Sequence, residues 1–432
     1  MWVGSVCTHE REVVQAAQAS VAAGLHTAAA QQPLAVQAYS CDPTTPSMQA
    51  ALLHHLGSSL SSVQFTYDSR VAAGDALPPG FKARWRSVLP QLAAAPAALA
   101  SLRSLEVTEP YRDSSVAAGH LPLSALSQLT SLQLLGKSEV SAKHMQQLPS
   151  KLQELQATLG EGSSQLSLAR LTALTQLHLS GPYTMAGSDS MPPKLAAATL
   201  LCGGQAAVQL AQLSRLQRLQ LGEACAPTAA QLRLLHRLLG LTELHLAYKP
   251  NLEMASCSFE NSPREVAKVL AGMSTLRVFR MRSLFPATPR WSSALMAGTR
   301  EALATLGRLS LHTLEIRSMP LGSIAKELAV RQLTLERLVL DNCNMSNKAL
   351  YAVLNCCPKL RELEVLNNCG YWHMLGDEGF GVGLDESGWL RLRPVQLPKL
   401  EWLSTQGTRV TPAGAAHLPG VKQVDMRYQV PG

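Results

Sequence analysis

One short phrase of hydrophobic and polar positions, L-x-x-L-x-L, recurs along most of the 432-residue chain. In its second half apolar residues alternate with others, which is typical of a strand that buries one face. Successive copies begin from 21 residues apart (Leu400 to Val421) to 42 residues apart (Leu60 to Leu102). The thirteen copies begin at Leu60, Leu102, Leu129, Leu152, Leu174, Leu216, Leu241, Leu276, Leu311, Leu335, Leu360, Leu400 and Val421. The pattern therefore predicts a series of short, similar strands.

Two further segments carry degenerate forms of the same phrase. Leu195 lies midway between the copies at Leu174 and Leu216, and the segment Leu195-Ala198-Leu200 keeps the alternation. Residues 33–38 resemble a degenerate copy that precedes the first clear one. Both segments are therefore expected to be strands as well.

Between the strand phrases the spacing of apolar residues changes to that of a helix, as in residues 46–56 and 346–354. Ser346 and Thr411 are suitable N-caps, and Pro412 suits the first turn of a helix. Strand, turn and helix in repetition predict parallel strands with helices outside them. A single repeat of this kind cannot bury its own apolar face, so neighbouring repeats must stack to be stable.

The most specific form of the repeat lies near the end of the chain. Residues 335–345 read LERLVLDNCNM, and Cys356-Cys357-Pro358 precedes the next phrase. This resembles the cysteine-containing class of leucine-rich repeats, which occurs in F-box ubiquitin ligase subunits and in ribonuclease-inhibitor-like proteins. The resemblance implies an α/β solenoid, a curved right-handed horseshoe with a parallel sheet on its inner face and helices outside. It also implies that Cys343 and Asn368 satisfy backbone groups of the turn that follows a strand.

The irregular spacing of the copies suggests how the chain is organised. Residues 1–55 are expected to form an N-terminal helical cap, with a helix over 10–30 and a degenerate repeat. Residues 56–432 are expected to form the leucine-rich-repeat array. Insertions interrupt the period near residues 70–98, 181–193 and 371–398. In solenoids such insertions form loops on one face, often the binding face.

The motifs of common enzymes are missing from the sequence. It contains no G-x-G-x-x-G, G-x-x-x-x-G-K-[ST], G-x-S-x-G or H-E-x-x-H, so we expect no catalytic residues and no cofactor. The nine cysteines are sparse and form no C-x-x-C pair, which favours free thiols in a reducing compartment and no metal site. No apolar stretch reaches the ~18 residues of a membrane helix. We therefore expect a cytoplasmic monomer without a membrane partner.

The strand residues that point away from the core form the candidate binding face. Basic residues recur there on successive strands, at Arg218, Arg280, Arg282, Arg317 and Arg337. Adjacent strands lie about 4.8 Å apart, so these guanidinium groups are predicted to form one patch that recognises an anion or an acidic peptide.

Other residue types on this face complete the candidate site. Glu315 and its acidic neighbours Glu243, Glu362 and Glu364 would partly neutralise the arginines. His245 occupies a central strand position, and Tyr248 and Trp402 are candidate aromatic anchors. The alternative interpretation is an ordinary solvated face with local ion pairs, each contributing little.

Charge and fold together favour a binding function. The net charge of +8 is a modest excess for this length and weak evidence for nucleic acid, so no nucleic-acid partner is expected. The main hypothesis is non-catalytic protein–protein recognition or scaffolding through the concave strand face, with an acidic protein partner. The family resemblance also admits a substrate-recognition subunit of an F-box-type ubiquitin ligase. The composition resembles that of a green alga's proteins, which include axonemal leucine-rich-repeat proteins, so a cytoskeletal or ciliary axonemal component is a third hypothesis.

Overall fold

The computed structural model divides the chain into two compact units, residues 1–209 and 210–432. Each unit has its own array of strands and its own outer layer. The expected boundary between residues 1–55 and 56–432 stays a prediction. The structure describes residues 2–3, 34–40, 60–67, 96–109, 123–136, 139–160, 166–181, 191–202, 210–224, 233–248, 262–283, 293–319, 321–330, 334–367, 375–382, 394–418 and 420–426.

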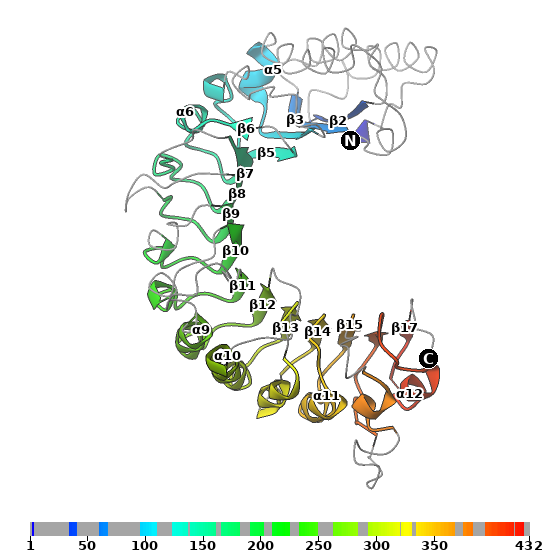
Figure 1. Cartoon of the computed structure of the whole chain (residues 1–432). Helices are drawn as coiled ribbons and strands as arrows, with labels where there is room; N and C mark the ends of the chain where they lie inside the picture. Colours follow the sequence, from blue (N-terminus) through cyan, green and yellow to red (C-terminus); the bar gives the residue numbers. More distant parts are fainter. Residues whose placement is uncertain are drawn as a thin grey trace, which may run out of the picture. The chain divides into compact units, whose positions relative to one another are not determined.

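The first unit consists of parallel strands that pair in chain order, with short helical turns on the opposite side (Figure 1). Its described helices are α5 (Pro96–Ser101), η4 (Leu123–Ala125, a 3-10 helix) and α6 (Ala142–Met145). Its described strands are β1 (Trp2–Val3), β2 (Leu34–Ser40), β3 (Leu60–Tyr67), β4 (Ser104–Glu109), β5 (Ser131–Gly136), β6 (Glu139–Val140), β7 (Glu154–Leu159), β8 (Gln176–Ser180) and β9 (Ala197–Cys202). Strands β2 and β9 confirm the prediction that the two degenerate copies form strands.

The second unit repeats this plan with longer helices. Its described strands are β10 (Arg218–Ala224), β11 (Glu243–Tyr248), β12 (Val278–Ser283), β13 (Thr313–Arg317), β14 (Arg337–Asp341), β15 (Glu362–Leu366), β16 (Trp402–Ser404) and β17 (Gln423–Asp425). Its described helices are α9 (Ser262–Ala271), α10 (Ser293–Leu306), η5 (Ser323–Val330, 3-10), α11 (Asn347–Leu354), η6 (Asp377–Phe380, 3-10) and α12 (Pro412–Ala416). The helices pack against one another in chain order and form the outer layer.

A repeated pattern of backbone hydrogen bonds joins each strand to the previous one. The carbonyl of Thr242 accepts from the amides of Arg277 and Val278, at 2.8 and 3.0 Å. The carbonyl of Arg277 in turn accepts from His312 and Thr313, at 2.8 and 3.1 Å. The same sharing of one carbonyl by two amides recurs at most other described strand starts. It fixes the register of each strand on its neighbour.

The core is a ladder of apolar side chains in matching register. Leu244, Phe279, Leu314, Leu338 and Leu363 follow one another across β11 to β15, and each is at most 1% exposed. Each fully buried side chain of this kind stabilises the fold by roughly 1.5–3 kcal/mol. Eleven of the thirteen phrases have their whole alternating half in a described strand, and the last two have its first apolar residue, Leu403 or Val424, in β16 or β17. The fold is therefore an α/β leucine-rich-repeat solenoid.

Local details of the second unit also follow the sequence. The Ser346 hydroxyl accepts from the Ala349 amide at 3.2 Å and so caps α11. Thr411 caps α12 in the same way. The buried Cys343 thiol donates to the carbonyl of Ile316, a residue of the neighbouring strand β13, at 3.2 Å. Asn368 lies outside the described residues.

Part of the 371–398 segment lies against the helices rather than over the strands. The amide of Gly376 donates to Asn347 Oδ1 of α11 at 2.9 Å. Asp377 of η6 accepts from both the backbone amide and the hydroxyl of Thr411, at 2.8 and 2.7 Å. These contacts bind η6 between α11 and α12. The helices expected over 10–30 and 46–56, and most of the 70–98 and 181–193 insertions, lie outside the described residues.

Candidate functional site

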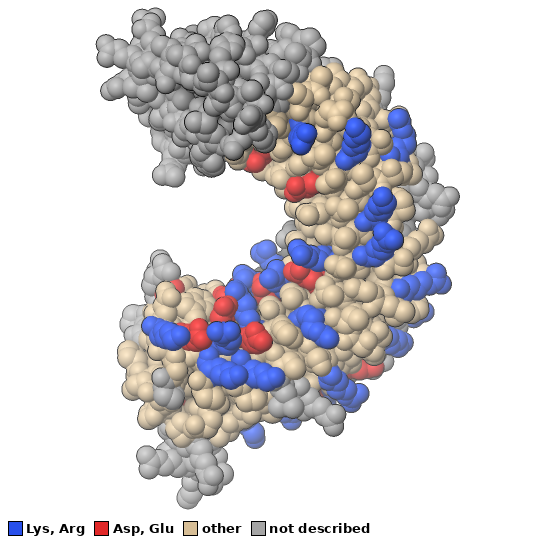
Figure 2. Space-filling model, turned by 180° about the vertical axis from the view of Figure 1, so that it is seen from behind, with Lys and Arg blue, Asp and Glu red and all other residues tan. Residues whose placement is uncertain are grey.

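The solvent-facing residues of β10–β17, here called the strand face, lie in the register that the repeat predicts. The central positions of successive strands are direct neighbours in the sheet. In order they are Gln220, His245, Arg280, Glu315, Val339, Glu364, Ser404 and Asp425. Figure 2 shows acidic side chains lying against basic ones on this unit.

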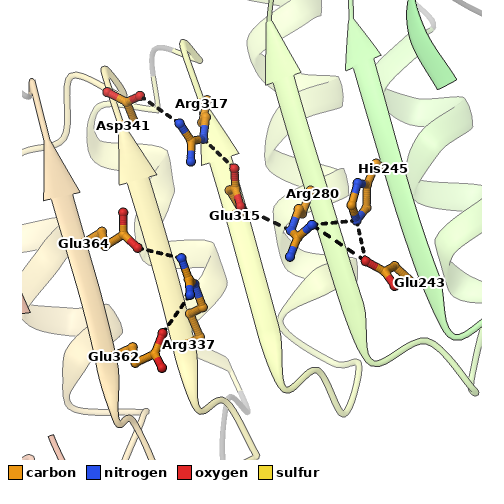
Figure 3. Close-up of polar contacts among 9 residues, drawn as sticks. All are labelled: Glu243, His245, Arg280, Glu315, Arg317, Arg337, Asp341, Glu362 and Glu364. Atoms are coloured by element: carbon orange, nitrogen blue, oxygen red, sulfur yellow. Dashed lines mark hydrogen bonds and ion pairs between the residues drawn. The ribbon is translucent and has the colours of Figure 1, made fainter. Parts of the chain in front are cut away.

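Arg280 is the centre of the first group of contacts (Figure 3). Its guanidinium lies 3.2 Å (Nε) from Glu315 Oε2 and 3.7 Å (Nη1) from Glu243 Oε1. The same Nη1 lies 3.1 Å from Nε2 of His245, which is itself 2.7 Å from Glu243 Oε1. One arginine therefore links side chains from three neighbouring strands.

Arg317 continues this group of contacts toward β14. Its Nε is paired with the Glu315 carboxylate, and its Nη1 lies 3.6 Å from Asp341 Oδ2. The side-chain amide of Asn367 donates to Asp341 Oδ1 at 2.9 Å. The contacts thus extend without a break from Glu243 on β11 to Asp341 on β14 (Figure 3), and from there to Asn367 beyond β15.

Arg337 forms a second, separate group with two glutamates. Its Nη1 lies 2.8 Å from Glu362 Oε2, and its Nη2 lies 2.7 Å from Glu364 Oε1. Burial raises the pKa of Glu364, and the charges of Arg337 and Arg317 act in the opposite direction. A single guanidinium is therefore shared by two carboxylates.

Val339 shows how closely these side chains cover the sheet. It occupies a central position of the strand face, between Glu315 and Glu364 in register, yet it is 0% exposed. An apolar side chain is stable there because the long charged side chains around it exclude water with their aliphatic stems. The polar central row that the sequence predicts is thus interrupted at this position.

Two of the predicted arginines are less constrained than the others. Arg218 is 72% exposed on its side chain, and its Nε is 3.9 Å from Glu243 Oε2. Arg282 is exposed on β12 beside Arg317 and forms no ion pair with any residue that the structure describes. Arg282 is therefore the cation on this face that is most available to a partner.

The two predicted aromatic anchors lie at different places on the sheet. Trp402 begins β16, is half-buried, and lies in register with Glu362 and Gln423. The backbone of Tyr248 ends β11 beside Ser283. The side chain of Tyr248 lies outside the described residues. Trp402 is therefore next to the acidic end of the strand face.

The sequence predicts the positions of these side chains but not their pairing. Opposite charges two residues apart on one strand, as in Glu315 and Arg317, lie on the same face. Opposite charges at matching positions of adjacent repeats, as in Arg280 and Glu315, are cross-strand neighbours. Applying both rules to the phrases would have indicated that most of the arginine patch is neutralised.

His245 gives this face a predicted dependence on pH. Burial first, and then the charge of Arg280, lower the pKa of His245, while Glu243 and Glu315 act against this. Below the ordinary imidazole pKa of about 6.5, the unfolded chain therefore binds a proton that the folded chain does not. Unfolding free energy should fall between pH 7.5 and pH 5.5, and His245→Gln should reduce that fall. The measurement is urea denaturation at both pH values.

The matched control for this prediction is His312→Gln. His312 is exposed at the edge of the same sheet, 3.9 Å from Glu336. If His245→Gln keeps the full pH dependence of the original chain, burial of the imidazole is not its cause.

Neither a metal site nor a membrane-spanning helix is found among the residues that the structure describes. No group of three or more His, Cys, Asp or Glu in the described part of the chain is placed to hold a metal ion. None of the described helices has the length and apolar character needed to span a bilayer.

Comparisons with known proteins relate the chain to solved structures only. No protein-family model and no curated protein matches the sequence. The crystal structure of the TLR13–ssRNA13 complex is 15% identical, with a TM-score of 0.42, covering 85% of this chain and 59% of that one. The functional domain of InlJ from Listeria monocytogenes, which includes a cysteine ladder, is 12% identical, with a TM-score of 0.33, covering 79% and 60%. This chain spans about three fifths of each of them.

Proposed function

We propose that the chain is a non-catalytic recognition or scaffold protein that binds a protein partner on the strand face. The observation that carries this proposal is the set of charged side chains held in place across β11–β15 by their own ion pairs. Side chains that are already ordered lose less conformational entropy when a partner binds. A sheet is also a rigid support for such a surface.

Two buried thiols of the second unit, Cys343 and Cys357, are better suited to packing than to covalent chemistry. Burial raises the pKa of both Cys343 and Cys357 to about 12. The thiolate is the reactive form of cysteine, so these two residues are inert at neutral pH. Both instead donate to backbone carbonyls, Cys357 to that of Val353 at 3.2 Å.

Within the proposed surface, Arg282 and Trp402 are the residues best suited to direct contact. Arg282 is exposed and has no ion pair among the described residues, so a partner need not displace an existing contact. Trp402 presents part of an aromatic ring beside Glu362. Arginine and tryptophan are the residue types most enriched at the energetic centres of interfaces. We further propose that Tyr248, His245 and the paired arginines contribute to the surface around them.

Reversal of one charge tests the function directly. Arg282→Glu should reduce the recovery of native partners by about tenfold, because a like charge then faces the acidic group that the partner presents. The measurement is quantitative proximity labelling in the native cell. The fold should be unchanged, because no ion pair within the described structure is lost.

Arg308→Glu is the matched control, since Arg308 is exposed in the turn after α10, away from the strand face. Equal recovery of the same partners by the original chain and by Arg282→Glu would show that this face is not the binding surface.

The identities of the labelled proteins separate the finer hypotheses. Ubiquitin ligase components would support an F-box-type recognition subunit, and axonemal or cytoskeletal proteins would support a structural role. Recovery of RNA-bound proteins would argue against the proposed protein partner. A cytoplasmic monomer is the state proposed for the free chain, and light scattering after size-exclusion chromatography tests it.

A further inference from the structure

The charges of the strand face are unevenly distributed along it. On β10–β13 the described side chains of the strand face include four arginines and two glutamates, which gives an excess of two positive charges. On β14–β17 the described side chains of the strand face include one arginine and four acidic residues, which gives an excess of three negative charges. The first zone comprises Arg218, Glu243, Arg280, Arg282, Glu315 and Arg317, and the second comprises Arg337, Asp341, Glu362, Glu364 and Asp425.

The ion pairs leave each excess at a definite place. In the first zone Arg280 and Arg317 are paired, whereas Arg282 has no ion pair within the described structure. In the second zone Glu362 and Glu364 share the single guanidinium of Arg337. The positive excess is thus centred near β12 and the negative excess near β15.

Arg317 and Asp341 pair across the boundary between the two zones at 3.6 Å, but the centres of the two excesses are too far apart to neutralise each other in solution. Strands β12 and β15 are separated by three strand spacings, or about 14 Å at about 4.8 Å each. The screening length at physiological salt is about 8 Å. A partner therefore encounters two centres of opposite charge rather than one neutral surface.

The shape of the second unit limits what can bind to both zones. Its strands lie on the inner side of its curve and its helices on the outer side (Figure 1). Two such faces cannot touch along their length, which argues against a second copy of this chain. A polypeptide segment is narrow enough to follow the strands from β10 to β17.

On the strand face to which a binding function is assigned above, we infer that the partner is a polypeptide segment with two oppositely charged clusters. Its acidic cluster lies over β10–β13 and its basic cluster over β14–β17. The separation of about 14 Å corresponds to about four residues of extended chain. The inference rests on the proposed function and adds the chemistry of the ligand.

Synthetic peptides test this charge pattern on the 432-residue chain. The block peptide has a run of glutamates, a spacer of about four glycine and serine residues, and a run of lysines. The comparison peptide has the same composition with alternating charges. By fluorescence anisotropy at low salt, the block peptide should bind about fivefold more tightly than the alternating one. The difference should disappear at high salt.

Variants of each zone locate the bound peptide. Arg282→Gln and Glu362→Gln should each remove most of the preference for the block peptide, whereas Arg308→Gln should leave it unchanged. Equal binding of the two peptides would overturn the inference. So would tighter binding of an all-glutamate peptide or of a short RNA, or the absence of binding by all of these probes.

The two proposals can fail independently. If partner recovery depends on Arg282 but the block and alternating peptides bind alike, the face binds proteins and the two-zone pattern is wrong. If partner recovery does not depend on Arg282, the proposed function itself is wrong.

Discussion

Replacing Phe279 by alanine should lower the free energy of unfolding by about 3–5 kcal/mol. Phe279 is fully buried on β12, where its neighbours in register are Leu244 and Leu314. Alanine at this position would leave a cavity between repeats that depend on one another for stability. Urea denaturation followed by circular dichroism measures the effect.

Phe279→Leu is the control for this cavity. Leucine is the residue that adjacent repeats use at the same position, so its cost should be below about 1.5 kcal/mol. An alanine variant as stable as the original chain would contradict a continuous stacked core.

The second large effect is expected for Arg280→Glu. This change removes the ion pairs to Glu243 and Glu315 and places a third carboxylate between them. The side chain of Arg280 is 41% exposed, so solvent screens part of the repulsion. The free energy of unfolding should fall by about 1–2 kcal/mol in low salt, and by less in high salt.

Arg282→Glu is the matched control for Arg280→Glu, because it reverses an equal charge two residues away on the same strand. It should change stability by less than about 0.5 kcal/mol. Equal destabilisation by the two variants would mean that the ion pairs of Arg280 contribute nothing. The comparison also explains why Arg282, rather than Arg280, is the better residue for testing partner binding.

The strands could be predicted because the sequence pattern follows directly from the burial pattern. In a strand that packs on one face, every second residue must be apolar, and Leu314 and Ile316 show this as plainly as Leu338 and Leu340. The degenerate copy at Leu195 can be recognised because it begins 21 residues from the start of each neighbouring phrase, at Leu174 and Leu216. The N-caps at Ser346 and Thr411 could be predicted because they depend on local sequence alone.

The charge balance of the strand face could not be obtained from composition along the chain. Arg337 and Glu364 are 27 residues apart in sequence, and their contact depends on the register of β14 on β15 and on both side-chain rotamers. The burial of Val339 depends on the same contacts. The position of η6 against α11 depends on Asn347, which the sequence presents only as an ordinary helix residue.

The carbonyls that each accept two amides also make the spacing of the surface independent of repeat length. His245 and Arg280 are register neighbours although 35 residues separate them, and Val339 and Glu364 are register neighbours although only 25 do. The additional residues are accommodated in the connections outside the sheet. Lengthening or shortening such a connection should therefore alter the stability of one repeat. The strand residues that a ligand contacts should keep the same spacing.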